Sequence, residues 1–328
     1  MAESSKRHAL VVAGMHRSGT SATTRVLNLL GADLPRELMP ASGVNASGLW
    51  ESSELIELHN AFLAAVESDW ADHSAIAKSR FNSDTAKQYQ AKILGILRRD
   101  FSESRLFVLK DPRICRLIPL WLAILDKFEV EPCFVIPIRN PLEVAVSLRK
   151  RNGFVPARSL LLWLRHVIDA ERETRSYKRS FISYETLVDD WVGTVTKIAG
   201  DLQIQWPIRP EDAKNKVEEF LSPELRHHVF SHRDFEARAD ISDWVKRTYK
   251  ALVLSSQGSK SNIFPEIDAV RDEFDKAAIA FDPIVSACRA RLVDLNAGRA
   301  QLRNELKSRN LKIEQLQSAL AKTESNVD

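Results

Sequence analysis

Eight residues near the N-terminus combine glycines, hydroxyls and an arginine in one short segment, Gly14-Met15-His16-Arg17-Ser18-Gly19-Thr20-Ser21. The segment follows a compact apolar run over 8–13, which predicts a buried strand, and precedes 20–30, whose apolar spacing predicts a helix. Glycines let a loop turn tightly with its N–H groups pointing inward, and the start of a helix adds partial positive charge. The loop is therefore predicted to bind an anion.

This loop differs from the usual ATP-binding loop at one position. In the pattern GxxxxGK[ST], a lysine reaches the β- and γ-phosphates and the next hydroxyl holds Mg²⁺. Thr20 stands where that lysine is required, and Arg17 is the full positive charge that the loop offers instead. A conventional ATP-using enzyme is disfavoured. For the loop taken alone, a glycine-bounded turn without any ligand remains the alternative.

An arginine and a serine stand at a second predicted junction between a strand and a helix. A strand predicted over 132–138 is followed by Arg139, and a helix predicted over 141–151 begins at a proline. Ser147 lies eight residues after Arg139, slightly over two helical turns, so both can face the same side. An arginine fork and a hydroxyl suit a phosphate monoester. Each residue is commonplace alone, but their order after the first loop is not.

Two further strand ends carry candidate residues. Lys110 stands at the end of a strand predicted over 105–109 and begins the run Lys110-Asp111-Pro112-Arg113, in which Arg113 can add charge or pair with Asp111. Tyr184 follows a short strand predicted over 181–183. The alternative for each is structural: a lysine surfacing at a strand end, and a core tyrosine at a junction.

In combination these segments resemble the P-loop sulfotransferase family, in its bacterial carbohydrate-type or tyrosylprotein-like branch, over roughly residues 8 to 200. The resemblance implies the donor 3′-phosphoadenosine 5′-phosphosulfate, the product adenosine 3′,5′-bisphosphate and no metal. It implies that Arg139 and Ser147 bind the 3′-phosphate, that Tyr184 lies near the adenine, and that Lys110 stabilises the sulfuryl group or the leaving oxygen. The residues implied to hold the 5′-phosphosulfate are Gly14, His16, Arg17, Ser18, Gly19, Thr20 and Ser21.

The implied chemistry also needs a base for the acceptor hydroxyl, alongside positioning and positive charge on the sulfuryl oxygens. Glu51, in Gly48-Leu49-Trp50-Glu51, is favoured because this segment is similar to one in bacterial members. Such a base needs its pKa raised by partial burial, for which Trp50 can supply an apolar wall. His16, His59 and Asp111 are the other candidates. The structural alternative is that Glu51 caps the next helix.

The composition predicts a folded chain with a substantial core. Of 328 residues, 44% are hydrophobic and 28% charged, and the net charge is +3. This mild excess does not predict nucleic-acid binding but suits a polyanionic ligand. No apolar run is long enough to span a membrane, so a soluble, cytoplasmic protein is expected. Three scattered cysteines, interpreted as small buried hydrophobes, favour a reducing compartment over a disulfide framework.

Strands alternating with helices predict an α/β fold, a P-loop-type mostly parallel sheet flanked by helices, with a C-terminal helical or coiled-coil extension. Three domains are predicted: 1–210, the core with the donor site; 211–283, the helical remainder; and 284–328, a coiled coil or long amphipathic helix. Further helices are expected over 53–66, 84–101, 118–128 and 159–177.

The last segment has a heptad pattern that Arg299 and Arg309 interrupt. Its apolar positions are Leu292, Leu306, Ile313 and Leu320 on one side and Leu295, Leu302 and Leu316 on the other. This pattern predicts a coiled coil, and with it a possible homodimer, or else a single helix folding back. Because the pattern still runs at the last residue, a longer polypeptide is a further hypothesis.

The expected function is transfer of a sulfuryl group to an acceptor hydroxyl on a glycan, a lipid-linked sugar or a small metabolite. One alternative is a P-loop small-molecule kinase, which needs Mg²⁺ and a loop lysine. The other is a non-catalytic scaffold that acts through its C-terminal helix. Retention of Arg17, Lys110, Arg139 and Ser147 together argues against the scaffold.

Overall fold

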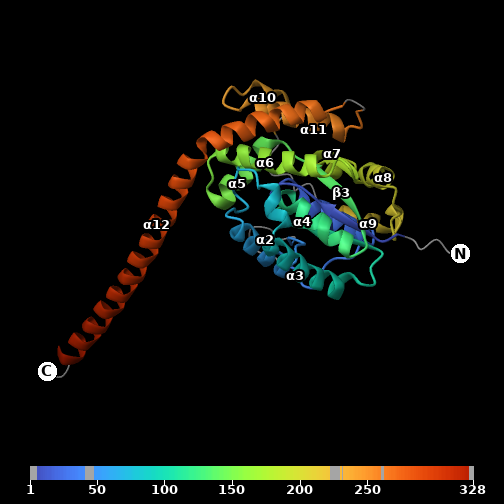
Figure 1. Ribbon diagram of the computed structural model, residues 1–328. Helices are drawn as coiled ribbons and strands as arrows, with labels where there is room; N and C mark the ends of the chain where they lie inside the picture. The colour runs from blue at the N-terminus through green and yellow to red at the C-terminus, as the bar shows by residue number, and fades with distance from the viewer. Residues whose placement is uncertain (1–5, 41–47, 222–229, 231, 260–261, 325–328) are drawn as a thin grey trace. The chain divides into compact units, whose positions relative to one another are not determined.

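The computed structural model describes residues 6–40, 48–221, 230, 232–259 and 262–324 (Figure 1). The chain divides into two compact units, Met1–Phe274 and Asp275–Asp328. The first unit contains the sheet and every candidate site residue. The domain boundaries expected after residues 210 and 283 stay predictions.

The centre of the first unit is a four-stranded sheet whose strands all run parallel. The strands are β1 (His8–Val12), β2 (Leu106–Lys110), β3 (Glu131–Ile138) and β4 (Lys178–Ser183), in the order β2-β1-β3-β4. His8 on β1 lies opposite Leu106 on one side and Glu131 on the other. The predicted α/β class with a parallel sheet flanked by helices is confirmed.

Helices connect the strands and continue beyond the sheet. Within the described residues they are α1 (Thr20–Leu29), α2 (Ser53–Ala65), η1 (Lys78–Asn82), α3 (Asp84–Phe101), α4 (Ile114–Lys127), α5 (Pro141–Asn152), α6 (Pro156–Glu173), α7 (Tyr184–Asp189), α8 (Trp191–Leu202), α9 (Pro210–Phe220), α10 (His232–Ala237), α11 (Asp243–Ser256) and α12 (Phe264–Glu324). The expectation that α4 begins near residue 118 is wrong by four residues. Its first turn closes earlier because the Ile114 N–H donates to the Asp111 carbonyl at 2.9 Å.

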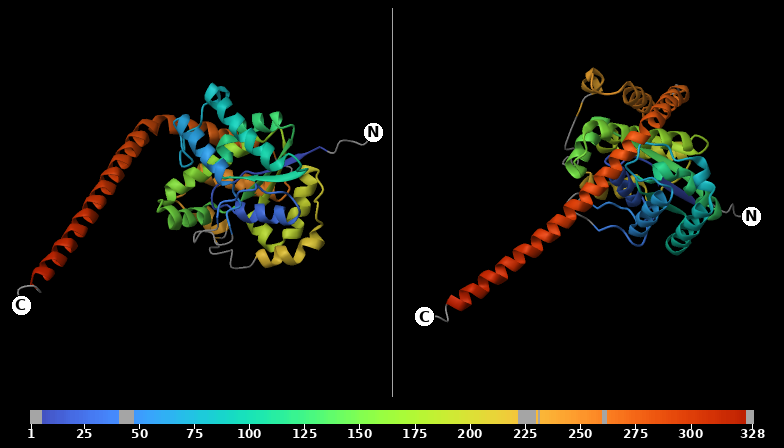
Figure 2. Two further views of the ribbon diagram at one scale, coloured as in Figure 1. Left: turned by 90° about the horizontal axis from the view of Figure 1, so that it is seen from below. Right: turned by 60° about the vertical axis from the view of Figure 1, so that its left-hand side comes forward.

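Alternating side chains of β1 enter two different cores. Leu10 and Val12 pack with Leu27 of α1 and with α8, whereas Ala9 and Val11 face the larger core that contains α3, α4 and α6. Figure 2 shows helices on both sides of the sheet. Such two-sided burial explains why the strands read as continuous apolar runs. Cys115 and Cys133 are buried as expected, but Cys288 is exposed.

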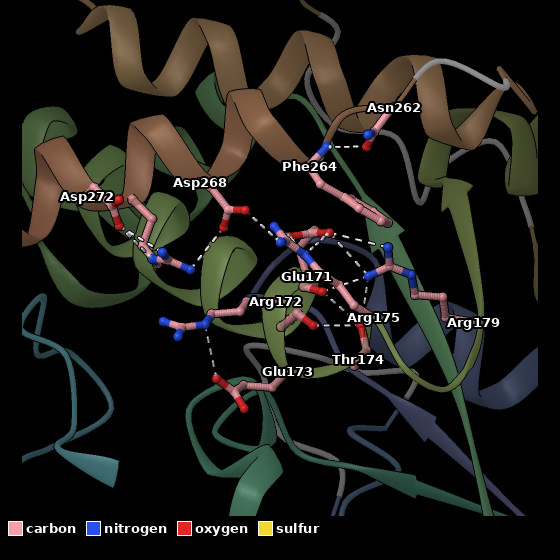
Figure 3. A network of polar contacts seen from close by, with 12 residues as sticks. Glu171, Arg172, Glu173, Thr174, Arg175, Arg179, Asn262, Phe264, Asp268 and Asp272 are labelled. Atoms are coloured by element: carbon pink, nitrogen blue, oxygen red, sulfur yellow. Dashed lines mark hydrogen bonds and ion pairs between the residues drawn. The ribbon is translucent and has the colours of Figure 1, made fainter.

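A buried ionic cluster fixes the first turn of α12 against α6 and β4 (Figure 3). The carboxylate of Glu171, fully buried on α6, contacts Arg175 at 2.7 Å and Arg179 at 3.3 Å. Arg175 also contacts Asp268 of α12 at 2.8 Å. The ring of Phe264 lies under both arginines, at 4.6 and 5.3 Å.

The second unit consists of helix over 275–324 with solvent-exposed apolar side chains. Leu295 and Leu302, both on the predicted seam, are 62% and 66% exposed. The side chain of Leu320 lies outside the described residues, and the coiled coil stays a prediction. Across the described part of both units, no helix has the length and apolar character needed to cross a membrane.

Candidate active site

The carboxyl ends of all four strands carry a candidate site residue. Lys110 is the last residue of β2, Arg139 directly follows β3, and Tyr184 directly follows β4. The loop 13–19 follows β1. In a parallel sheet these ends share one edge, and ligands bind where the connections leave in opposite directions. Here the chain passes from β1 to β2 toward one side of the sheet and from β3 to β4 toward the other. The expected ligand position is therefore the crevice between the carboxyl ends of β1 and β3.

Close packing explains the two glycines of the loop. Gly19 adopts φ +84°, and a Cβ added there would lie 2.1 Å from Cδ2 of Tyr184. A Cβ on Gly14 would lie 2.8 Å from the ring of Pro137. A side chain at either position therefore collides with a neighbouring strand end. Arg17 also adopts a left-handed backbone, φ 69°, which costs energy for a residue other than glycine and often marks functional loops.

Two polar atoms of this loop are buried without a hydrogen-bond partner among the described residues. They are the Ser18 hydroxyl and Nε2 of His16. Helix α1 begins directly after Gly19, which provides no side-chain cap, so the N–H groups of its first turn lack that partner too. Buried polar groups are normally satisfied, and the free donors at Ser18 and the first turn of α1 match the oxygens of a bound anion. The loop therefore fits the phosphosulfate expected there.

Arg17, Ser147 and Arg139 meet at the β1–β3 crevice. Nε of Arg17 donates to the Ser147 hydroxyl at 2.6 Å, and Arg139 donates to the Arg17 carbonyl at 3.1 Å. The Arg139 guanidinium lies 4.6 Å from the centre of the Tyr184 ring and bonds Glu143 at 2.7 Å. Burial, and then the charge of Arg139, lower the pKa of Arg17. Two guanidiniums and a hydroxyl thus lie together at this crevice, an arrangement that suits a doubly charged phosphate.

Lys110 and Glu51 form a buried ion pair beside the loop. The ammonium of Lys110 donates to Ser21 at 3.1 Å, to the Leu49 carbonyl at 2.8 Å and to Oε1 of Glu51. Burial raises the pKa of Glu51 although Lys110 opposes this change, and burial lowers the pKa of Lys110. The second carboxylate oxygen of Glu51 has no hydrogen bond from the described residues.

Helix α2 is capped by Ser52 rather than by Glu51. The Ser52 hydroxyl accepts the Leu55 N–H at 3.3 Å. The structural alternative, in which Glu51 serves as the cap, is therefore wrong. Glu51 directly precedes this cap, and its carboxylate accepts a hydrogen bond from Lys110 instead of capping the helix.

His59 and Asp111, two other candidates for the base, are fully engaged. Nδ1 of His59 bonds Asp111 at 2.7 Å, and Nε2 accepts the Trp121 indole N–H at 3.0 Å. An indole only donates, so the proton of His59 is assigned to Nδ1. Burial alone would raise the pKa of Asp111, but the bonds from His59 and the charge of Arg113 hold it well below its usual range. The expected pairing of Arg113 with Asp111 is present, at 2.9 Å.

His16 is a further candidate for the base. Its ring meets Trp70 edge to face at 4.6 Å. Burial, followed by the charges of Arg151 and Arg113, lowers the pKa of His16 well below its usual value, so the ring is neutral at pH 7. A neutral imidazole can donate or accept one hydrogen bond at Nε2, but with so low a pKa it is a weak base.

Sequence reasoning missed three residues that border the site: Trp70, Trp121 and Arg151. For Arg151 a signal exists, since it lies four residues after Ser147 and hence on the same helix face. For the two tryptophans there is none, because their contacts depend on how α2 and α4 pack. In the described part of the chain, no group of three or more His, Cys, Asp or Glu is arranged to hold a metal ion.

Comparisons with known proteins give likeness in structure only. No protein-family model matches the chain, and no curated protein matches it. A solved sulfotransferase domain from the curacin biosynthetic pathway is 16% identical and aligns over 82% of this chain and 97% of its own, with a TM-score of 0.40. A sulfotransferase domain from the Synechococcus PCC 7002 olefin synthase is 17% identical over 84% and 97%, with a TM-score of 0.36. At TM-scores this low, substrate and mechanism rest on the chain's own residues.

Proposed function

We propose that this chain transfers a sulfuryl group from 3′-phosphoadenosine 5′-phosphosulfate to the hydroxyl of an acceptor. The observation that carries the proposal is the charge arrangement at the carboxyl edge of the sheet. Arg17, Arg139 and Ser147 gather on one side of the α1 N-terminus, while Lys110 and Glu51 lie on the other. Two separate anion sites with a carboxylate beside the second match a donor with two anionic ends.

The 3′-phosphate is assigned to the Arg17, Arg139 and Ser147 group. The 5′-phosphosulfate is assigned to the loop 14–21, with the unpartnered Ser18 hydroxyl and the first turn of α1 as donors. Tyr184 supports both sites because its ring packs between Gly19 and Arg139. Its contact with the adenine stays a prediction.

Glu51 is proposed as the base that takes the proton from the acceptor hydroxyl. The donor supplies an already activated sulfuryl group. Lys110 is placed to neutralise negative charge on the sulfuryl and leaving oxygens, because its ammonium already bonds Ser21 of the loop. As Lys110 turns toward such oxygens it leaves Glu51. The pKa of that buried carboxylate then rises further, which strengthens it as a base.

Two features favour this function over the alternatives. Thr20 occupies the loop position at which a lysine would bind a nucleotide γ-phosphate. Its side chain is buried, with the methyl group close to Gly14. A scaffold that binds no donor gains nothing from the buried, unpartnered hydroxyl of Ser18. Buried polar atoms of that kind cost free energy unless a ligand satisfies them.

Thermal stability in the presence of nucleotides tests the donor assignment. Adenosine 3′,5′-bisphosphate at a hundred times its Kd should stabilise the fold by about 2.7 kcal/mol, whereas ATP with Mg²⁺ should raise the melting temperature much less. Labelled donor and a panel of hydroxyl compounds (glycans, lipid-linked sugars and small metabolites) then test transfer. Equal stabilisation by the two nucleotides would contradict the assignment.

A further inference from the structure

Arg151 continues the line of site residues along α5. It lies four residues after Ser147 on the same face, one turn or about 6 Å further along the helix. Ser147 contacts Arg17, whereas the Arg151 guanidinium lies over the Trp70 ring, 5.5 Å from its centre. Arg151 therefore stands beyond the group assigned to the 3′-phosphate.

No carboxylate of the described residues pairs with Arg151. Its Nε donates to the Asn152 side chain at 2.6 Å. By contrast, Arg113 pairs with Asp111, Arg139 with Glu143, and Lys110 with Glu51. The Arg151 side chain is half-buried; burial, followed by the charge of Arg17, lowers its pKa to about 10. A partly desolvated cation without a counter-ion is costly, so an anionic ligand is the expected partner.

The surroundings of Arg151 place that ligand beside His16 of the loop. Trp70, which stacks on Phe154 with ring centres 5.9 Å apart, touches the Arg151 guanidinium on one hand and the His16 ring on the other. Nε2 of His16 is buried without a partner. Glu51 is close enough for its charge to act on Arg151. The Trp70 ring thus contacts both the Arg151 guanidinium and the His16 imidazole.

Other residues are already assigned to the two anionic ends of the donor. Arg17, Arg139 and Ser147 are assigned to the 3′-phosphate, and Lys110 with the α1 N-terminus to the 5′-phosphosulfate. Arg151 is the cation not assigned to the donor, and Trp70 lies between it and His16. We propose that Arg151 and His16, held by Trp70, form an acceptor subsite for an anionic group. The acceptor is then a hydroxyl compound that also carries a carboxylate or a phosphate, such as an acidic sugar. This inference rests on the proposed function.

Three sugars that share the 2-, 3- and 4-hydroxyls test the subsite: methyl glucoside, methyl glucuronide and methyl glucoside 6-phosphate. Transfer from labelled donor gives kcat/KM for each. Melting of the protein saturated with adenosine 3′,5′-bisphosphate reports sugar binding without turnover. One charged hydrogen bond is worth about 1.5–3 kcal/mol, so at least one anionic sugar should be preferred about tenfold or more. The two anionic arms separate carboxylate from phosphate recognition.

Variants on the same helix turn locate the effect. Arg151→Met should lower the anionic preference about tenfold, Arg151→Lys should retain part of it, and Lys150→Met, which removes an exposed charge, should leave it unchanged. For all three variants the Kd of adenosine 3′,5′-bisphosphate should stay within about threefold of the native value. Loss of a direct contact worth about 1.4 kcal/mol would raise this Kd about tenfold.

Each other outcome has a fixed meaning. If the native chain shows no anionic preference in either assay, or no sugar binds, the subsite is refuted. If Arg151→Met instead weakens adenosine 3′,5′-bisphosphate about tenfold or more, Arg151 belongs to the donor site and the subsite is refuted. If the native chain does not bind adenosine 3′,5′-bisphosphate at all, the proposed function itself has failed.

Discussion

At the residue scale, Glu51 is the proposed base, because it alone among the candidate carboxylates keeps an oxygen without a hydrogen bond from the described residues. Glu51→Gln removes the base while keeping shape. Turnover should fall by about 10²–10⁴-fold, and the Kd of adenosine 3′,5′-bisphosphate should stay near that of the native chain. Glu54→Gln is the matched control, since Glu54 lies in the first turn of α2 but pairs with Arg99. Unimpaired turnover in Glu51→Gln would assign the base to another residue.

The pH dependence of kcat/KM follows from the same pair. Glu51 acts as a base only when deprotonated, and burial raises its pKa. Activity should therefore increase with pH through a midpoint above the ordinary glutamate value of about 4.3. The pKa of Lys110 is lowered by burial, so activity should fall again below the ordinary lysine value of about 10.4. Lys110→Met should remove the alkaline limb; a profile unaffected by both Glu51→Gln and Lys110→Met would contradict these roles.

Gly19 tests whether close packing at the loop matters. Gly19→Ala combines a left-handed backbone with a Cβ only 2.1 Å from Tyr184, and should abolish binding of adenosine 3′,5′-bisphosphate. Gly153→Ala supplies the same backbone strain, φ +70°, with open space around the new Cβ. It should cost about 1 kcal/mol of stability yet keep binding. Equal binding by the two variants, measured by calorimetry, would show that the Tyr184 contact is unimportant.

Sequence reasoning at this scale named candidate residues that the structure brings together, but it did not predict how they meet. Turn chemistry alone predicts glycines in the loop. Gly19 is required for a further reason: the ring of Tyr184, far away in the sequence, packs against it. Likewise the spacing of Arg139 and Ser147 predicts a shared face, but the bond from Arg17 to Ser147 depends on how β1 lies beside β3.

At the element scale, the Glu171 cluster fixes the first turn of α12 to α6 and β4 (Figure 3). Removal of its carboxylate leaves Arg175 with Asp268 as its remaining partner and Arg179 with no carboxylate among the described residues. Breaking a buried ion pair from one side costs about 3–5 kcal/mol. Glu171→Ala should lower the free energy of unfolding in urea by about that amount. The control is Arg80→Ala, which breaks an ion pair exposed on both sides and should leave the unfolding midpoint nearly unchanged. Similar midpoints for both variants would contradict the clamp.

Element boundaries were predictable where a proline or a glycine marks them. Helix α5 begins at Pro141, as its sequence predicts, and ends before Gly153, which adopts a left-handed cap. By contrast, α4 begins at Ile114, four residues before the predicted start, although the apolar spacing of Ile114, Leu117 and Ile118 already indicates the earlier boundary. β4 likewise starts at Lys178, three residues before the apolar run, because strand pairing rather than hydrophobicity sets its length.

At the scale of the whole molecule, the seam of the second unit predicts self-association. Leu302 and Leu306 occupy adjacent seam positions and are 66% and 59% exposed. An apolar heptad stripe is self-complementary, so a second copy of this chain is the predicted partner. Leu302→Glu with Leu306→Glu should convert a dimer to a monomer in sedimentation equilibrium. Leu311→Glu, exposed but off the seam, should not. A native chain that is monomeric at every concentration would contradict the dimer.

The sheet illustrates what a single sequence reveals about a whole fold. Buried runs separated by helices predict parallel strands, and parallel strands predict that Lys110, Arg139 and Tyr184 share an edge. The order β2-β1-β3-β4 was not predictable, because buried strands of similar composition pair equally well in several orders. That order is what brings Arg17 beside Arg139, and so decides where a doubly charged group can bind.

The central claim is that this crevice recognises the 3′-phosphate of the donor. Calorimetric titration with adenosine 3′,5′-bisphosphate and with adenosine 5′-phosphate, which lacks that group, tests it most directly. Two charge-assisted contacts predict at least about a hundredfold tighter binding of the bisphosphate, and Arg139→Met should erase most of the difference. Equal affinity of the native chain for the two nucleotides would contradict the account.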